Sequence, residues 1–230
     1  MGYTEKDFER FRSNELAKGD TFKFKCQMCG RCCRNRTEPV MVNGFDVFRF
    51  SKALDMPLRD SLLLNCKMYI GDSSHIPVFA LSERMDGSCR LMRKGKCIVQ
   101  DNKPIVCALF PLGRYYDVRD NSYHYFRNAG ICPGTDAGNE RTLSDWLERF
   151  HIEELTDETT AWSKLMLGIA GATARWDKHR VESNIELINV MVGLLYTNYQ
   201  YDSPYIQQVE MNMEMAKVYF QMRFNKKLDF

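Results

Sequence analysis

Hydrophobic and polar residues follow two different patterns along this chain, and the pattern changes near Gly138. After that residue, apolar positions recur every three or four residues, which is the spacing of amphipathic helices. Before it, apolar runs are short and interrupted by glycine, proline and charged residues, as is typical of small strands and loops. The sequence therefore predicts an α+β fold, with a loop-rich domain in residues 1–137 and a helical region in residues 138–230.

Local signals indicate where several helices begin. Thr142 and Asp145 have the spacing of an N-terminal capping box, and Pro57 stands where a first helical turn accepts proline. Helices are expected over residues 4–18, 46–54, 57–65, 159–176 and 181–199, with a short one from residue 142 and a last one from residue 203.

Two of these helices carry long apolar stripes, which we interpret as core-facing. The stripe of residues 181–199 comprises Val181, Ile185, Ile188, Val192, Leu195 and Tyr199. The stripe of the last helix comprises Val209, Met213, Ala216, Phe220 and Phe224.

The loop-rich part also contains strand patterns. Residues 76–81 are apolar and extended in character, but Pro77 cannot donate a ladder hydrogen bond, so an edge strand is expected. Residues 115–118 and 123–126 flank a polar turn and predict a β-hairpin. The first domain is thus expected to combine an N-terminal helix, a small hairpin and long loops.

Nine cysteines, all within the first 132 residues, now require an explanation. The net charge of +2 lacks the basic excess of a nucleic-acid-binding protein, and no apolar run is long enough to span a bilayer. The first residues also lack the apolar core of a signal peptide. We therefore expect a cytoplasmic protein without a nucleic-acid or membrane partner, in which clustered cysteines are ligands or catalysts rather than disulfides.

The run from Cys26 to Cys33 is the strongest chemical signal. It places cysteines at Cys26, Cys29, Cys32 and Cys33, so that two residues separate each of the first three. This spacing lets one backbone turn direct two sulfurs at a single ion or cluster, as in zinc and iron–sulfur sites. Gly30 suits the tight turn that such a run requires. Thiol redox motifs share a single pair, but they do not share this longer run.

Four more cysteines complete the expected metal-binding set. Cys89, Cys97, Cys107 and Cys132 each lie near a glycine or proline, where loops can converge on a metal. Cys66 ends an apolar run and is interpreted as a packed thiol. His124 is a weaker candidate for a ligand or acid–base group, and the simpler interpretation is a half-buried strand residue.

Basic residues surround these cysteines, and cations of this kind stabilise a negatively charged thiolate site and lower thiol pKa values. They are Lys23, Lys25, Arg31, Arg34 and Arg36 beside the first run, and Arg90, Arg93, Lys94 and Lys96 beside the second. An ordinary exposed basic loop accounts for part of the same pattern.

The cysteine blocks resemble the CxxCxxCC cysteine-cluster family, also called YkgJ-like, which is associated with zinc or iron chelation. The blocks are residues 26–33, 87–91 (Gly-Ser-Cys-Arg-Leu), 97–99, 103–112 (Lys-Pro-Ile-Val-Cys-Ala-Leu-Phe-Pro-Leu) and 132–134 (Cys-Pro-Gly). Lys103 and Ala108 stand where arginine is usual in that family. The resemblance covers about residues 22–140 and implies a prokaryotic origin and metal binding at all eight cysteines of the set.

The resemblance leaves three classes of function open. A larger relative with this pattern, flagellin lysine N-methylase, implies an enzyme that uses S-adenosylmethionine to modify a protein or peptide. An electron carrier or redox sensor would need only a closed iron–sulfur cluster. A zinc-stabilised binding module would hold a protein or peptide partner through its helical half. We favour iron, as an iron–sulfur cluster, because the overlapping run resembles ferredoxin ligands, whereas structural zinc sites usually use separated pairs.

Adjacent Cys32 and Cys33 further suggest two metal centres. Neighbouring side chains point to opposite sides of an extended backbone, so their sulfurs are expected to diverge. Eight candidate cysteines also exceed the four ligands of one small centre. We therefore expect these two cysteines to serve different centres.

Overall fold

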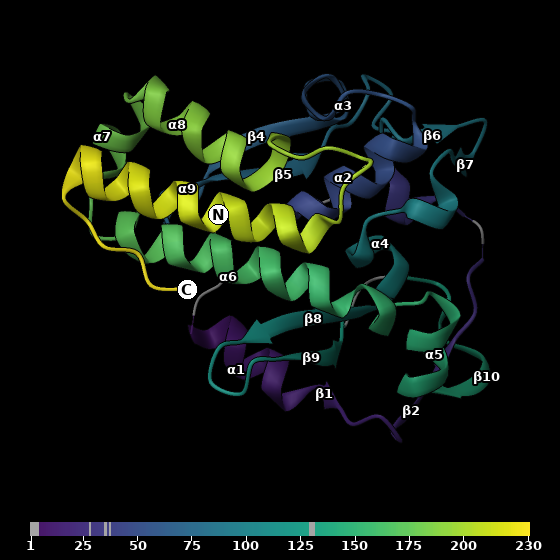
Figure 1. Ribbon diagram of the computed structural model, residues 1–230. Coiled ribbons are helices and arrows are strands. Elements are labelled where there is room, and N and C mark those ends of the chain that lie inside the picture. Colours follow the sequence, from purple (N-terminus) through teal and green to yellow (C-terminus); the bar gives the residue numbers. More distant parts are fainter. Residues whose placement is uncertain (1–4, 28, 35, 37, 129–131) are drawn as a thin grey trace. The chain divides into compact units, whose positions relative to one another are not determined.

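The computed structural model describes residues 5–27, 29–34, 36, 38–128 and 132–230 (Figure 1). Small antiparallel sheets occupy the N-terminal part and long helices the C-terminal part, which confirms the predicted α+β class. Of the helices in these ranges, none combines the length and apolar character needed to cross a bilayer.

Backbone contacts divide the chain into two compact units, each built from two separate stretches of sequence. We call the described residues of 5–40 and 82–156 the cysteine unit, and residues 41–81 with 157–230 the helical unit. Strand β10 (Thr135–Thr142) crosses residue 138 and belongs wholly to the cysteine unit. The compact units are defined by backbone contacts and do not test the boundary predicted from the sequence. The division into a metal-binding domain (residues 1–137) and a helical region (residues 138–230) therefore stays a prediction.

The cysteine unit contains short strands and helices joined by loops. They are α1 (Glu5–Ser13), β1 (Glu15–Leu16), β2 (Thr21–Phe24), η1 (Arg31–Cys33), β6 (Met92–Arg93), β7 (Lys96–Cys97), η2 (Gln100–Asn102), α4 (Ile105–Leu109), β8 (Leu112–Asp117), β9 (Ser122–Arg127), β10, α5 (Leu143–Arg149) and η3 (Glu153–Leu155). The predicted hairpin is confirmed as β8 and β9, with β1 on the outer side of β9. Helix α1 ends at Ser13 instead of residue 18, because Glu15 and Leu16 pair with β9.

Aromatic and aliphatic side chains form the core of the cysteine unit beneath its loops. Phe22 and Phe24 of β2 pack edge-to-face on Trp146 of α5. The Trp146 indole also donates a 3.0 Å hydrogen bond to the carbonyl of Leu109, which fixes α4 against α5. Thr142 caps α5 as predicted, since its hydroxyl accepts from the amide of the third helical residue. Cys132 packs against this core, so the core supports part of the predicted ligand set.

In the described residues, the helical unit consists of a three-stranded sheet and seven helices or helical turns. They are β3 (Met41–Val42), α2 (Gly44–Ala53), α3 (Leu58–Asn65), β4 (Cys66–Ile70), β5 (Pro77–Leu81), α6 (Thr156–Thr173), α7 (Lys178–Glu182), α8 (Ile185–Val192), the π-helix η4 (Gly193–Thr197) and α9 (Tyr205–Phe224). The helices predicted at residues 46–54, 57–65 and 159–176 and from residue 203 are all present, with ends shifted by a few residues.

Two sequence predictions for the helical unit were wrong. The strand at β5 is central, in the order β3-β5-β4, and is not an edge strand. Pro77 is tolerated because it opens the strand, whereas β3 reaches only Phe79 and Ala80. The single helix expected over residues 181–199 is broken into α7, α8 and η4, because Asn184 accepts the amide of Leu187 and starts a new helix. Ile185, expected in the core, is 72% exposed.

The core of the helical unit brings its two sequence stretches together. Phe79 of β5 and Trp162 of α6 both pack edge-to-face on the buried ring of Tyr196. The Trp162 indole donates to the carbonyl of Leu195 at 2.7 Å. Gly44 lies so close to these groups that a Cβ atom there would stand 2.1 Å from the Leu195 oxygen. The α9 stripe predicted for the core is buried or half-buried throughout.

Candidate metal centre

The first cysteine run follows directly from the pairing of β2 with β10. The amide of Lys25 donates to the carbonyl of Gly134 at 3.0 Å, which fixes the chain just before Cys26. Gly30 then adopts a left-handed conformation, with φ of 70°, and opens the 3-10 helix η1. The turn predicted at Gly30 is thereby confirmed. Cys26, Cys29 and Cys32 are exposed, while Cys33 is half-buried.

The sulfurs of Cys32 and Cys33 lie 3.8 Å apart. Both residues belong to η1, so the premise of an extended backbone with diverging side chains was wrong. Two thiolates bound to one tetrahedral ion at a metal–sulfur distance of about 2.3 Å lie about 3.8 Å from each other. The observed spacing therefore fits two ligands of a single ion.

Backbone hydrogen bonds join the second cysteine block to the first. The amide of Cys89 donates to the carbonyl of Cys33 at 2.8 Å, and Arg34 forms a β-bridge with Ser88. These contacts place buried Cys89 beside the sulfur pair although 56 positions separate it from Cys33 in the numbering. The pairing of remote segments thus builds this part of the site.

A short hairpin and a short helix bring two more sulfurs to the same region. Cys97 of β7 pairs with Met92 of β6, whose amide donates to the Cys89 carbonyl at 3.0 Å. Cys107 lies in α4, and its amide donates to the carbonyl of Pro104 at 2.8 Å. Burial is the main cause that raises the pKa of Cys97, and the charge of Cys89 adds to it. The hydrogen bond with Cys32 and burial raise the pKa of Cys33, and the charges of Cys107 and Cys89 add to them. Five cysteines therefore share one electrostatic neighbourhood: Cys32, Cys33, Cys89, Cys97 and Cys107.

Within this neighbourhood, Cys32 and Cys33 differ in acidity. The hydrogen bond with Cys33 is the main cause that lowers the pKa of Cys32 to about 6, and the charges of Lys103 and Arg36 add to it. The same hydrogen bond and burial raise the pKa of Cys33. A thiolate in this pair accepts a hydrogen bond from the neighbouring thiol, which favours loss of one proton, and thiolates are the form of cysteine that binds metals.

Backbone amides point at three of the predicted ligand sulfurs: those of Cys89, Cys97 and Cys132. The Leu91 amide donates to the sulfur of Cys89, and the Val99 amide donates to that of Cys97. The amide of Gly134 lies 3.4 Å from the sulfur of Cys132. In each case the donor follows the cysteine by two residues. Such N–H···S hydrogen bonds orient sulfur ligands and stabilise their negative charge.

Cys132 is placed by the β2–β10 pair. It precedes β10, whose Thr135 pairs with Phe24 at the end of β2. Because Cys26 follows β2 after Lys25, the β2–β10 pair presents Cys26 and Cys132 at one end. The eight predicted ligands therefore all lie in the cysteine unit, whereas Cys66 is buried in the helical unit.

The described side chains do not form a complete set of ligands around one point. Among them, no three histidine, cysteine or acidic groups converge as the ligands of one ion. The site, in the ranges given above, consists of the close sulfur pair with the other cysteines placed around it by loops and hairpins.

Two arginines that support the site differ in how well the sequence revealed them. Arg36, one of the expected basic neighbours, is 8% exposed and forms a 3.0 Å ion pair with Glu83. Arg84 was not recognised. Its guanidinium donates to the carbonyls of Cys89 and Met92 at 2.8 and 2.7 Å and to that of Arg90 at 2.5 Å. Only the loop that folds around Arg84 shows this role, because its partners are backbone atoms that carry no sequence signal.

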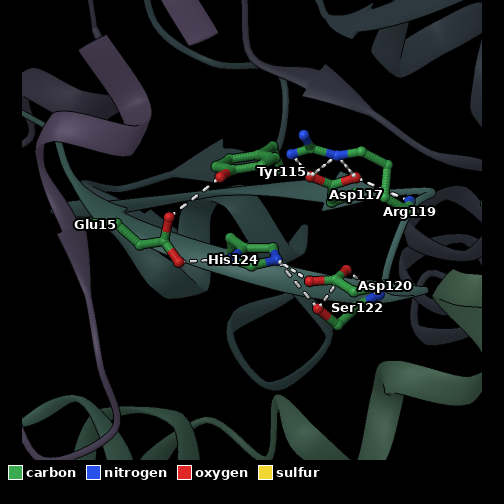
Figure 2. Close-up of polar contacts among 7 residues, drawn as sticks. All are labelled: Glu15, Tyr115, Asp117, Arg119, Asp120, Ser122 and His124. Atoms are coloured by element: carbon green, nitrogen blue, oxygen red, sulfur yellow. Dashed lines mark hydrogen bonds and ion pairs between the residues drawn. The ribbon is translucent and has the colours of Figure 1, made fainter. Parts of the chain in front are cut away.

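His124, the weaker candidate, lies in a different polar cluster, shown in Figure 2. Its Nδ1 lies 2.5 Å from Glu15 of β1, and its Nε2 lies 2.7 Å from Asp120 in the hairpin turn. The ring also stacks on Tyr115, with centroids 5.2 Å apart. Since carboxylates face both ring nitrogens, the structure supports a structural role for this half-buried histidine.

Comparison with known proteins leaves the geometry as the main guide to function. No protein-family model, curated protein or solved structure matches the chain. The resemblance to the CxxCxxCC family therefore rests on the cysteine blocks themselves and stays a prediction.

Proposed function

We propose that this chain is a metal-binding protein that holds iron or zinc through cysteine thiolates in its cysteine unit. The observation that carries the proposal is the 3.8 Å separation of the Cys32 and Cys33 sulfurs. Three more cysteines share their electrostatic neighbourhood, and backbone amides already donate to two of those three sulfurs. A buried thiol used only for packing needs none of these features.

The short distance between the Cys32 and Cys33 sulfurs also limits which type of metal centre they can bind together. A four-iron cluster takes four cysteines, one on each iron, whereas one iron of a two-iron cluster takes two thiolates and one zinc ion takes up to four. The run from Cys26 to Cys32 has the spacing of bacterial ferredoxins, which favours iron over zinc. The adjacent sulfurs of Cys32 and Cys33, however, do not fit one cysteine on each iron of a four-iron cluster. We therefore propose an iron–sulfur cluster in which these two cysteines share one iron, as in a two-iron cluster, with tetrahedral zinc as the alternative.

The arrangement suggests a different ligand grouping from the one expected from sequence. We propose that Cys32 and Cys33 bind the same centre together with Cys89 and one of Cys97 and Cys107, which gives that centre four thiolates. Cys26 and Cys132, at one end of the β2–β10 pair, form with Cys29 a second group. Cys32→Ser and Cys33→Ser should then remove the same metal, and the double variant should lose no more than either single variant.

The test of the proposal is the metal content of protein purified without oxygen. Visible absorption together with iron, zinc and acid-labile sulfide distinguishes the two metals, because zinc–thiolate proteins are colourless and iron–sulfur clusters are coloured. Cys66→Ala serves as the matched control, since this cysteine lies in the helical unit. Protein that takes up neither metal on anaerobic reconstitution would refute the proposal, and losses that add in the Cys32/Cys33 double variant would refute the grouping.

Methylation with S-adenosylmethionine, and a protein or peptide partner, remain predictions from the family resemblance. Binding of S-adenosylmethionine to the reconstituted protein would distinguish an enzyme from a redox carrier or a zinc-stabilised binding module.

A further inference from the structure

The β6–β7 hairpin concentrates positive charge on the surface of the cysteine unit (Figure 1). Arg93, Lys94 and Lys96 have exposed side chains, and Arg90, which lies just before the hairpin, is exposed as well. Residues 87–100 contain these four cations and no aspartate or glutamate. The net charge of this one segment, +4, therefore exceeds the net charge of the whole chain, +2.

The cations of the hairpin point away from the proposed metal ligands. Met92 pairs with Cys97 in the ladder, and these two side chains are buried and half-buried. Arg93 pairs with Lys96, one position nearer the turn, and both are exposed. Because successive side chains of a strand alternate between its faces, the two cations lie on the face opposite Cys97. They are therefore directed at solvent and not at the sulfur.

Ion pairs within the chain do not neutralise these charges. The acidic residues that precede the hairpin, Glu83 and Asp86, pair with Arg36 and Arg34 at 3.0 and 3.8 Å. In the part of the chain that the structure describes, none of the four cations of residues 87–100 forms an ion pair. The hairpin thus presents free positive charge to a partner.

Two features of the hairpin are unfavourable for its own stability. Arg93 and Lys96 stand directly opposite each other, and like charges in this position destabilise a pair of strands. Lys94 has a positive φ of 46°, although a two-residue turn of this kind favours asparagine, aspartate or glycine. An aspartate there would suit the turn and also reduce the repulsion. The hairpin keeps its positive charge at a cost to local stability, as is expected of a functional site.

We propose that the β6–β7 hairpin binds an acidic segment of a partner protein, whose carboxylates pair with Arg93, Lys94 and Lys96. Opposed residues on antiparallel strands have Cβ atoms about 4.5–5.5 Å apart, and residues three or four positions apart on a helix have them about 5–6 Å apart. Two carboxylates on one face of a helix therefore match Arg93 and Lys96. The guanidinium of Arg93 can also donate two parallel hydrogen bonds to one carboxylate.

Other anionic partners fit the hairpin less well. Proteins that bind single-stranded nucleic acid combine cations with aromatic side chains that stack on the bases, and residues 87–103 contain no aromatic residue. Residues that insert into a lipid surface are apolar, whereas the turn of the hairpin consists of Lys94 and Gly95. The small, purely cationic surface therefore favours a short acidic protein segment.

Fluorescence anisotropy with the full chain tests the inference. The probe is a fluorescein-labelled, alanine-rich peptide with glutamates in the i, i+4 spacing, and the control peptide has glutamine at the same positions. We expect the chain to bind the glutamate peptide more tightly, and added sodium chloride to weaken the complex, because salt screens exposed charges. The double variant Arg93→Gln/Lys96→Gln should raise the dissociation constant at least ~10-fold.

The double variant Lys226→Gln/Lys227→Gln is the matched control, because it removes the same charge from exposed lysines of the helical unit. The hairpin variant should melt at the same temperature as the unmodified chain or higher, since it removes the repulsion between the two strands. The inference rests on the hairpin and not on the proposed metal centre. Metal content is measured in parallel, so that loss of metal and loss of peptide binding are scored separately.

Equal affinity of the chain for the two peptides would overturn the inference, and so would equal effects of the two double variants. Oligothymidylate and vesicles of phosphatidylserine and phosphatidylcholine serve as alternative ligands. If either binds more tightly than the glutamate peptide and loses affinity in the hairpin variant, the hairpin binds a nucleic acid or a lipid surface and the inference is wrong.

Discussion

His124 is an example of a residue whose surroundings fix its charge. The carboxylate of Glu15 raises its pKa above the ordinary value of 6.5, and Asp120 acts in the same direction on the other ring nitrogen. Tyr115 of β8 stacks on the ring, and Asp117 of the same strand contributes further negative charge. When it is protonated, the ring links β1 to the β8–β9 hairpin by ion pairs on both sides (Figure 2).

This link should make stability depend on pH. Because the pKa is raised in the folded state, the charged ring contributes fully below the unfolded pKa, and the contribution disappears as pH rises through the folded pKa. We expect the unfolding free energy to fall by about 1 kcal/mol or less over this range, since the pairs are partly exposed. Denaturant unfolding at a series of pH values measures it.

His124→Gln should flatten this pH dependence, whereas His151→Gln is the control. His151 pairs with Glu154 at 2.7 Å on the surface, with a side chain 70% exposed. An equal slope in the unmodified chain and in His124→Gln would show that the ion pairs of His124 contribute no stability.

Cys66 shows that burial alone does not make a cysteine a ligand. It is 8% exposed and pairs with Leu81 in the sheet of the helical unit, while the eight candidate ligands lie in the cysteine unit. Cys66→Ala should leave the metal content intact and cost about 1 kcal/mol or less of stability. Metal analysis beside Cys29→Ser checks this; comparable metal loss in both variants would mean that Cys66 is also a ligand.

At the scale of elements, the loop of residues 82–92 depends on Arg84. The guanidinium donates to three backbone carbonyls of its own loop, and its Nη1 also bonds the hydroxyl of Ser88 at 3.2 Å. The planar fork of arginine reaches several acceptors at once, which the single ammonium of lysine does not. This loop carries Cys89 and leads into the β6–β7 hairpin that carries Cys97.

Arg84→Lys should therefore weaken the metal site without touching a ligand. We expect a loss of about 2 kcal/mol in stability, the scale of charged hydrogen bonds, and faster removal of metal by a chelator. Arg90→Lys is the matched control, because Arg90 lies in the same loop with an exposed side chain. Equal rates of metal loss in the two variants would contradict this role for Arg84.

At the scale of the molecule, the two compact units should respond differently to metal. The cysteine unit has short elements joined by loops and contains all eight candidate ligands, whereas the helical unit has its own aromatic core around Tyr196. Bound structural metals contribute folding free energy, on the order of 10 kcal/mol for tight zinc sites. Chelation should therefore lower the melting temperature of the cysteine unit sharply.

Calorimetry before and after anaerobic chelation measures this effect, and far-UV circular dichroism monitors the helices. We expect most helical signal to persist, since α6, α8 and α9 belong to the helical unit. Restoring the metal should restore the original melt. An unchanged melting temperature after verified metal loss would show that the metal does not stabilise the fold.

Local patterns in the sequence determined several features directly. The capping box at Thr142, the β8–β9 hairpin and the buried stripe of α9 depend on residues close in sequence, so their periodicity and caps were sufficient to predict them. The candidate cysteines were also visible in the sequence, because metal ligands require particular side chains at particular spacings.

Tertiary structure decided the rest, because long-range contacts outweigh local propensity. The central place of β5 and the joining of residues 41–81 with 157–230 depend on partners far away in the sequence. The interruption before Ile185 is instead a local cap at Asn184, which the apolar periodicity did not reveal. In the site, a local helical turn brings the sulfurs of Cys32 and Cys33 together, and the long-range hydrogen bond from the Cys89 amide to the Cys33 carbonyl places the next sulfur beside them. Spacing in the sequence identifies which atoms can bind a metal, but the backbone pairing between remote loops determines which of the distant ones meet.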